Sequence, residues 1–124
     1  MQFSISRENL LKPLQQVCGV LNSRPNIPVL NNVLLQIEDN RLTITGTDLE
    51  VELSSQTQLS SSSENGTFTI PAKKFLDICR TLSDDSEITV TFEEDRALVQ
   101  SGRSRFTLTT QPAEEYPNLT DWQS

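Results

Sequence analysis

The stretch "FTIPAKKFLDIC", residues 68–79, repeats the plan of "FSISRENLLKPL", residues 3–14. The two copies align Phe3 with Phe68, an offset of 65 residues (68 minus 3). In each copy, alternating apolar residues come first and apolar residues at helical spacing follow, which predicts a short strand and then a helix. An internal repeat of this kind organises the whole chain, because both copies are expected to fold in the same way.

The similarity continues downstream of both helices. "LQIEDNRLTITGTDLEVELSSQ", which begins at Leu35, matches "VTFEEDRALVQSGRSRFTLTTQ", which begins at Val90. Arg41 aligns with Arg96, an offset of 55 residues (96 minus 41). Each copy alternates apolar and polar residues and is punctuated by turn-forming residues such as "EDN" and "TGTD", so each predicts three strands joined by tight turns.

The chain therefore divides into two β-α-β-β-β units, at about residues 1–58 and 67–111. Such units predict an α+β domain in which antiparallel strands form one layer and two helices pack on it side by side. The polar run "SSSSE", residues 60–64, is expected to be the loop between the units. Later strands are expected at about 33–38, 41–46 and 49–58, and again at about 87–92, 96–100 and 103–110.

Three residues mark the expected helix boundaries. Ser6 is suited to cap the first helix, and Pro71 to the first turn of the second helix, where its missing N–H has no partner to lose. Pro13 is expected to interrupt and kink the first helix.

The composition is that of one ordinary globular domain. The chain has 124 residues, of which 35% are hydrophobic and 22% charged. No apolar run approaches the roughly 20 residues of a membrane span, and the start lacks the pattern of a signal peptide, so we expect a cytoplasmic protein. Cys18 and Cys79 fall at helical apolar spacing and are interpreted as small buried hydrophobes.

Charge is distributed unevenly along the chain. The formal net charge is −7, yet residues 1–24 and 71–80 together carry six Lys or Arg and two Asp or Glu. The remainder carries four basic residues (10 minus 6) and fifteen acidic ones (17 minus 2). The helices can therefore face a polyanion while the strands repel one. Charge counting alone does not separate this from the alternative that the basic residues are simply solvated helix faces.

Enzymatic chemistry is not indicated by the residues present. The chain has no histidine and four glycines, and it shows no phosphate-binding glycine loop and no cysteine spacing for metal, so we expect no cofactor and no metal. The acidic residues Asp48, Glu50 and Glu52 share one strand face, which leaves a carboxylate-dependent hydrolase as a rival. Because Glu50 and Glu52 alternate with apolar residues, a solvated strand face accounts for them better.

The motifs "RENLLKPLQQV", "RPNIPVL", "TITGTDLEVEL", "IPAKKFLDICR", "SGRSRFTL" and "YPNLTDWQS" occur in this order from end to end of the chain. They resemble the amino-terminal domain of the bacterial sliding clamps, the beta subunits of DNA polymerase III. The resemblance implies the DNA-clamp fold and a non-enzymatic role: two three-domain chains close head to tail into a ring around duplex DNA and tether the polymerase.

By this resemblance, residues 1–124 form a single domain truncated from a three-domain chain, in which DNA polymerase III and the clamp loader dock on domains absent here. Arg24 matches the family's DNA-contacting loop arginine, and Lys73 matches a second DNA-contact position, both directed at phosphates without regard to sequence. The remaining basic residues of the helical segments, Arg7, Lys12 and Arg80, are assigned to the same DNA-facing surface.

The resemblance also implies a subunit interface, formed by the last strand and the second helix. The expected contacts are Arg103, Arg105, Phe106 and Leu108 on the strand and Lys74, Ile78 and Leu82 on the helix. The basic members are expected to meet acidic residues of a partner subunit. A protein-interaction domain that uses an exposed edge strand and does not bind DNA remains the alternative function.

Overall fold

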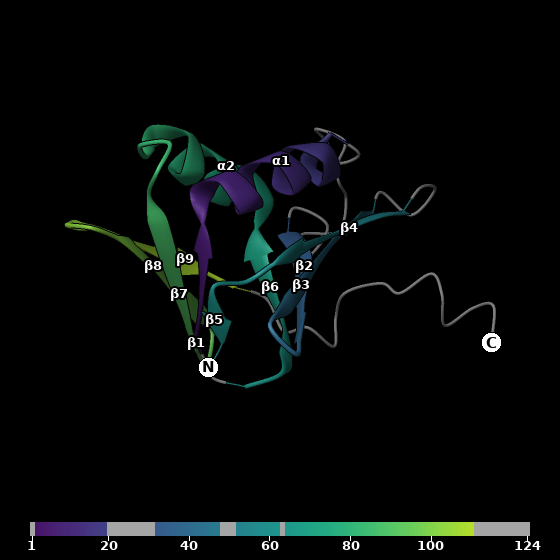
Figure 1. Ribbon diagram of the computed structural model, residues 1–124. Helices are drawn as coiled ribbons and strands as arrows, with labels where there is room; N and C mark the ends of the chain where they lie inside the picture. Colours follow the sequence, from purple (N-terminus) through teal and green to yellow (C-terminus); the bar gives the residue numbers. More distant parts are fainter. Residues whose placement is uncertain (1, 20–31, 48–51, 63, 111–124) are drawn as a thin grey trace.

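The computed structural model describes residues 2–19, 32–47, 52–62 and 64–110 (Figure 1). Both halves follow the predicted order, because β1-α1-β2-β3-β4 is followed, after the short β5, by β6-α2-β7-β8-β9. The helices are α1 (Arg7–Cys18) and α2 (Ala72–Thr81). The strands are β1 (Gln2–Ser6), β2 (Asn32–Glu38), β3 (Arg41–Thr47), β4 (Glu52–Gln58), β5 (Ser61–Ser62), β6 (Gly66–Pro71), β7 (Glu87–Glu93), β8 (Arg96–Ser101) and β9 (Ser104–Thr109).

The α+β class with two helices on antiparallel strands is confirmed, but the expected single layer of strands is wrong. The strands form two antiparallel sheets, in the orders β5-β1-β7-β8-β9 and β4-β3-β2-β6. The first strand of each half pairs with the other half, β1 with β7 and β6 with β2. Alternation along a strand reveals its buried face but not its partner, since pairing joins residues far apart in the sequence.

The core lies between the two sheets and beneath both helices. Figure 1 shows α1 and α2 together on one side of the molecule, with the two sheets descending from them. Leu10 and Leu14 of α1 and Phe75 of α2 are fully buried, and so are Val90 of one sheet and Ile44 of the other. The helices and both sheets therefore share one core. Burial of each such side chain stabilises the fold by about 1.5–3 kcal/mol.

Helix α1 runs unbroken through Pro13, which is itself buried. As expected, Ser6 caps the helix, because its hydroxyl accepts a bond of 3.2 Å from the Asn9 N–H. A proline has no N–H, so Pro13 cannot bond the carbonyl of Asn9 four residues earlier. That carbonyl instead accepts a bond of 2.8 Å from the Thr57 hydroxyl on β4. Because Pro13 leaves the Asn9 carbonyl without a helical partner, this carbonyl can accept the bond that links α1 to the four-stranded sheet.

The first hairpin turn of each half uses left-handed backbone at equivalent positions. Asp39 and Asn40, between β2 and β3, have φ of 52° and 64°, and Glu94, between β7 and β8, has φ of 37°. In the β2–β3 turn both central residues have positive φ, which is the geometry of a type I′ turn and matches the twist of the flanking strands. The turn predicted from "EDN" is therefore confirmed.

Two other predicted loops are partly strand. Residues 45–47 of "TGTD" complete β3, which continues past its expected end at residue 46. Ser61 and Ser62 of the serine run form β5, which pairs with β1 because that strand has an open edge beside it. Polar residues are compatible with this position, since an edge strand faces water.

Candidate functional site

Exposed cations gather on the helices. Lys12 of α1 and Lys73, Lys74 and Arg80 of α2 are all exposed. Lys73 and Arg80 are seven residues apart, which places them on the same face of α2. Asp77 lies between them, with its carboxylate 3.8 Å from the Arg80 guanidinium. Both side chains are more than half exposed, so this pair contributes only about 0–1 kcal/mol and leaves Arg80 able to exchange partners.

Arg7 differs from the other helical cations because its guanidinium is already engaged within the protein. Its Nε donates to the Cys79 carbonyl at 2.7 Å, and its terminal nitrogen lies 2.9 Å from the Asp84 carboxylate. The Arg7 side chain is 14% exposed, whereas that of Asp84 is fully exposed. No local pattern in the sequence connects Arg7 with Asp84, which lie 77 residues apart. The available signal was a cation at the first position of a helix, where the macrodipole disfavours it.

The expected DNA-contacting loop arginine, Arg24, lies outside the described residues. The offset between the two halves falls from 65 to 55 residues across this part of the sequence, so the first half carries ten extra residues (65 minus 55) between its helix and its later strands.

A second face of α2 carries the helical part of the expected subunit interface. Lys74 and Ile78 are four residues apart, and Leu82 follows four residues later, immediately after the end of the helix. Lys74 is exposed and Leu82 is half-buried, but Ile78 is only 8% exposed because it belongs to the domain's own core. Apolar surface for a partner is therefore supplied by Leu82 more than by Ile78.

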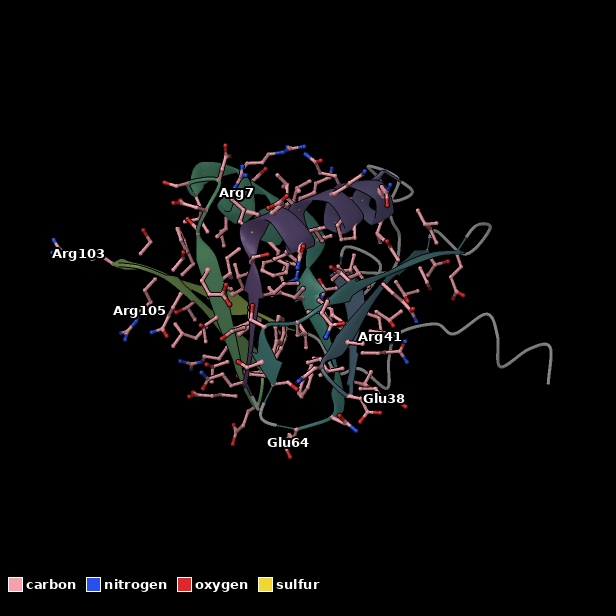
Figure 2. The ribbon with its side chains drawn as sticks, in the orientation of Figure 1. Arg7, Glu38, Arg41, Glu64, Arg103 and Arg105 are labelled. Atoms are coloured by element: carbon pink, nitrogen blue, oxygen red, sulfur yellow. The ribbon has the colours of Figure 1, made fainter. Side chains whose placement is uncertain are left out.

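Strand β9 lies at the edge of the five-stranded sheet and pairs, among the described strands, with β8. Arg103 is not in this strand, contrary to the sequence expectation. It forms the two-residue hairpin turn with Gly102, whose φ of 56° is a backbone conformation that favours glycine. Figure 2 shows Arg103 at the tip of this hairpin and Arg105 further along it, both directed away from the body of the protein.

The two faces of β9 differ in chemistry. Arg105 is exposed, whereas Phe106 is half-buried and Leu108 is 7% exposed, so both apolar side chains face the core. The edge thus offers backbone groups that no second strand of the described residues pairs, a cationic outer face and a partly open phenyl ring. These features suit the addition of a strand from another chain.

Neither metal binding nor thiol chemistry is supported in the described parts of the chain. No group of three or more His, Cys, Asp or Glu there is arranged to hold a metal ion. Burial raises the pKa of Cys18 to about 11 and that of Cys79 to about 12, so both thiols remain protonated at neutral pH. Of the acidic strand residues, Glu52 begins β4 and is half-buried, whereas Asp48 and Glu50 lie outside the described residues.

Comparison with known proteins assigns this arrangement to one family. Residues 1–120 match the family described as the DNA polymerase III beta subunit, N-terminal domain. The chain belongs to that family. It is 96% identical over all 124 residues to the beta sliding clamp of Haemophilus influenzae and 55% identical to that of Escherichia coli. The chain spans 34% of the length of each of these relatives, about a third.

Solved structures of family members carry the same fold. A sliding clamp from Pseudomonas aeruginosa, crystallised with griselimycin, superposes with a TM-score of 0.92 at 51% identity. A polymerase III beta subunit from Caulobacter crescentus gives a TM-score of 0.91 at 36% identity. Each comparison covers 96% of this chain and 32% of the solved chain. The two-sheet architecture of this chain is therefore the architecture of sliding-clamp domains.

No helix among the described residues is long and apolar enough to cross a membrane.

Proposed function

We propose that the chain is the DNA-facing amino-terminal domain of a sliding clamp, a ring around duplex DNA that tethers the replicative polymerase. The observation that carries this proposal is the polarity of the domain. Among the described residues, the two helices bear five Lys or Arg and two Asp or Glu, whereas the remainder bears four and ten. Because the helices share one side of the molecule, the cations are presented to a polyanion from that side while the rest repels it.

In this proposal Lys12, Lys73 and Arg80 contact phosphates, together with Arg24. A clamp that slides must hold DNA without gripping it, so its contacts are few and directed at the backbone rather than at bases. A few lysines and arginines fulfil that requirement, and Lys12 and Lys73 provide exposed point charges without the fixed fork of an arginine. No reaction is needed, and the domain acts by enclosing its ligand.

The proposed partner of β9 is a second clamp subunit, related head to tail. The edge strand supplies backbone hydrogen bonds, Phe106 and Leu82 supply apolar area, and Arg103, Arg105 and Lys74 meet acidic residues across the interface. Polymerase and clamp loader then act through the other two domains of a three-domain cytoplasmic chain. The rival function, a protein-interaction domain without DNA binding, also uses the β9 edge. It gives no binding role to the lysines and arginines of α1 and α2.

The experiment is retention on nicked circular DNA by a full-length clamp that carries this domain. Replacing Lys73 and Arg80 by Gln should shorten retention and lower the slope of log affinity against log salt by about 1.8 for each subunit of the ring, since each lost phosphate contact contributes about 0.9. Arg41→Gln with Arg96→Gln is the matched control, because both are exposed arginines on strands. If the helical pair changed retention no more than the control, the domain would not face DNA through α2.

A further inference from the structure

Arg7 lies at the start of α1, where the helix dipole disfavours a cation, and beside the end of α2, where the dipole favours one. It is the first residue of α1, and a cation at that end opposes the positive end of the helix macrodipole. Its guanidinium turns instead to the last turn of α2, where carbonyl groups lack helical partners and the dipole is negative. The bond from Nε to the Cys79 carbonyl, at 2.7 Å, lies in this last turn.

Arg7 makes three bonds to one short segment. Besides the Cys79 carbonyl, its guanidinium reaches the Asp84 carboxylate at 2.9 Å, and its backbone N–H donates to the Ser86 carbonyl at 2.9 Å. Residues 79–86 comprise the end of α2 and the connection to β7. One residue thereby joins the start of α1 to the end of α2 and to the strand that follows.

The opposite ends of the two helices also meet, but without a charge. The Cys18 thiol at the end of α1 lies 3.8 Å from the Ala72 carbonyl at the start of α2. Ala72 is the counterpart of Arg7 in the repeat, at the offset of 65 (72 minus 7). Of these two junctions, the one at Arg7 includes an ion pair, and the other is a bond from a thiol to a backbone carbonyl.

We propose that Arg7 is a positioning residue for the cationic face of α2 rather than a phosphate contact. It holds the end of α2 against the start of α1 and so sets the direction in which Lys73 and Arg80 point. The test of this inference by retention on DNA rests on the proposed function, whereas its test by hydrogen exchange does not. Its 14% exposure leaves little of the side chain available to a ligand.

The structural test is amide hydrogen exchange in a full-length clamp carrying this domain. Arg7→Gln should accelerate exchange of the Leu82 and Ser86 amides at least about tenfold, because the ionic tie to their segment is lost. Asp84→Asn, at a fully exposed position, should accelerate the same amides to a smaller extent. Arg96→Gln is the control and should leave them unchanged. Unaltered exchange in Arg7→Gln would overturn the positioning role.

The DNA test separates positioning from direct contact through Asp84. If Arg7 bound phosphate, Asp84→Asn would release it and remove a negative charge, so retention on DNA would lengthen. If Arg7 positions α2, Asp84→Asn should shorten retention in the same direction as Arg7→Gln, although it makes the domain more positive. Longer retention in Asp84→Asn would therefore contradict the proposal.

A double-mutant cycle completes the design. Arg7→Gln should shorten retention about threefold or more in the native background and have no further effect once Lys73 and Arg80 are Gln, because it acts through them. If Arg7→Gln only destabilised the fold, its effect on retention well below the melting temperature would not depend on whether Lys73 and Arg80 are present. If the unaltered clamp showed no salt-dependent DNA binding, the proposed function would fail while hydrogen exchange would still decide the role of Arg7.

Discussion

The phenyl rings of Phe68 and Phe92 stack across the two sheets, with centroids 4.2 Å apart and planes inclined by 10°. Phe68 lies on β6 and Phe92 on β7, so one ring comes from each sheet. Phe3, the counterpart of Phe68 in the repeat, lies 6.2 Å from Phe92 on the same sheet. Phe92 therefore joins the two sheets at a place where both halves of the chain meet.

Removing the Phe92 ring should destabilise the domain strongly. Phe92→Ala is expected to lower the free energy of unfolding by about 3–5 kcal/mol, because it leaves a cavity between the sheets, and Phe92→Leu by less than about 1.5 kcal/mol. Urea denaturation of the 124-residue chain measures both. Leu98→Ala, at a half-buried position, is the control and should cost less than Phe92→Ala. Equal losses at the two positions would remove the special role of the stacked pair.

The exchange of first strands between the halves predicts that neither half folds alone. Dividing the chain between residues 63 and 64 leaves β1 without β7 and β2 without β6. Each fragment should give a poorly dispersed amide NMR spectrum, and mixing the two should restore the dispersion of the intact domain. A dispersed spectrum from either fragment as a monomer would contradict this prediction.

The buried thiols predict a loss of stability at alkaline pH. Burial raises the pKa of Cys79 from 9.0 to about 12 and that of Cys18 from 9.0 to about 11. The folded state therefore holds its thiol protons more tightly than the unfolded state. Their contribution is complete below pH 9 and is lost as the pH rises through the folded values, at up to about 1.4 kcal/mol per pH unit for each thiol.

The measurement is thermal unfolding of the 124-residue chain between pH 8 and pH 11. A variant with Cys18→Ala and Cys79→Ala should start less stable at pH 8 and decline less steeply toward pH 11. It also serves as the control, since it retains every lysine that titrates in the same range. Parallel declines in the two proteins would show that the thiols do not cause the loss.

Charge reversal at the β8–β9 hairpin should open the proposed ring without unfolding the domain. In a full-length clamp, Arg103→Glu with Arg105→Glu should raise the dimer dissociation constant at least about tenfold, because basic residues facing acidic partners become repulsive. Arg96→Glu, on the neighbouring strand, is the control. Sedimentation velocity gives the dimer fraction. An intact dimer in the double variant would place the interface elsewhere.

The isolated 124-residue chain should be chiefly monomeric in the same experiment, because β9 is proposed to pair with a different domain of the partner. A tight symmetric dimer of this chain would contradict the head-to-tail arrangement.

Local pattern determined most of the elements. The alternation around Phe92, the helical spacing around Phe75 and the "EDN" turn each depend on residues close in sequence, so the strands, the helices and that turn could be predicted. The exposed cations of α2 were predictable for the same reason, since Lys73 and Arg80 share a face by helical spacing alone.

Tertiary structure decided the rest, because the remaining relationships join residues that no local pattern connects. The pairing of β1 with β7, and therefore the division into two sheets, depends on backbone partners some 85 residues apart, as at Ser4 and Thr89. The role of Arg7 depends on a carboxylate 77 positions away. The sequence alone determined which side chains are basic, while packing determined that Arg7 bonds to the end of α2 and that the other basic side chains of the described residues are exposed.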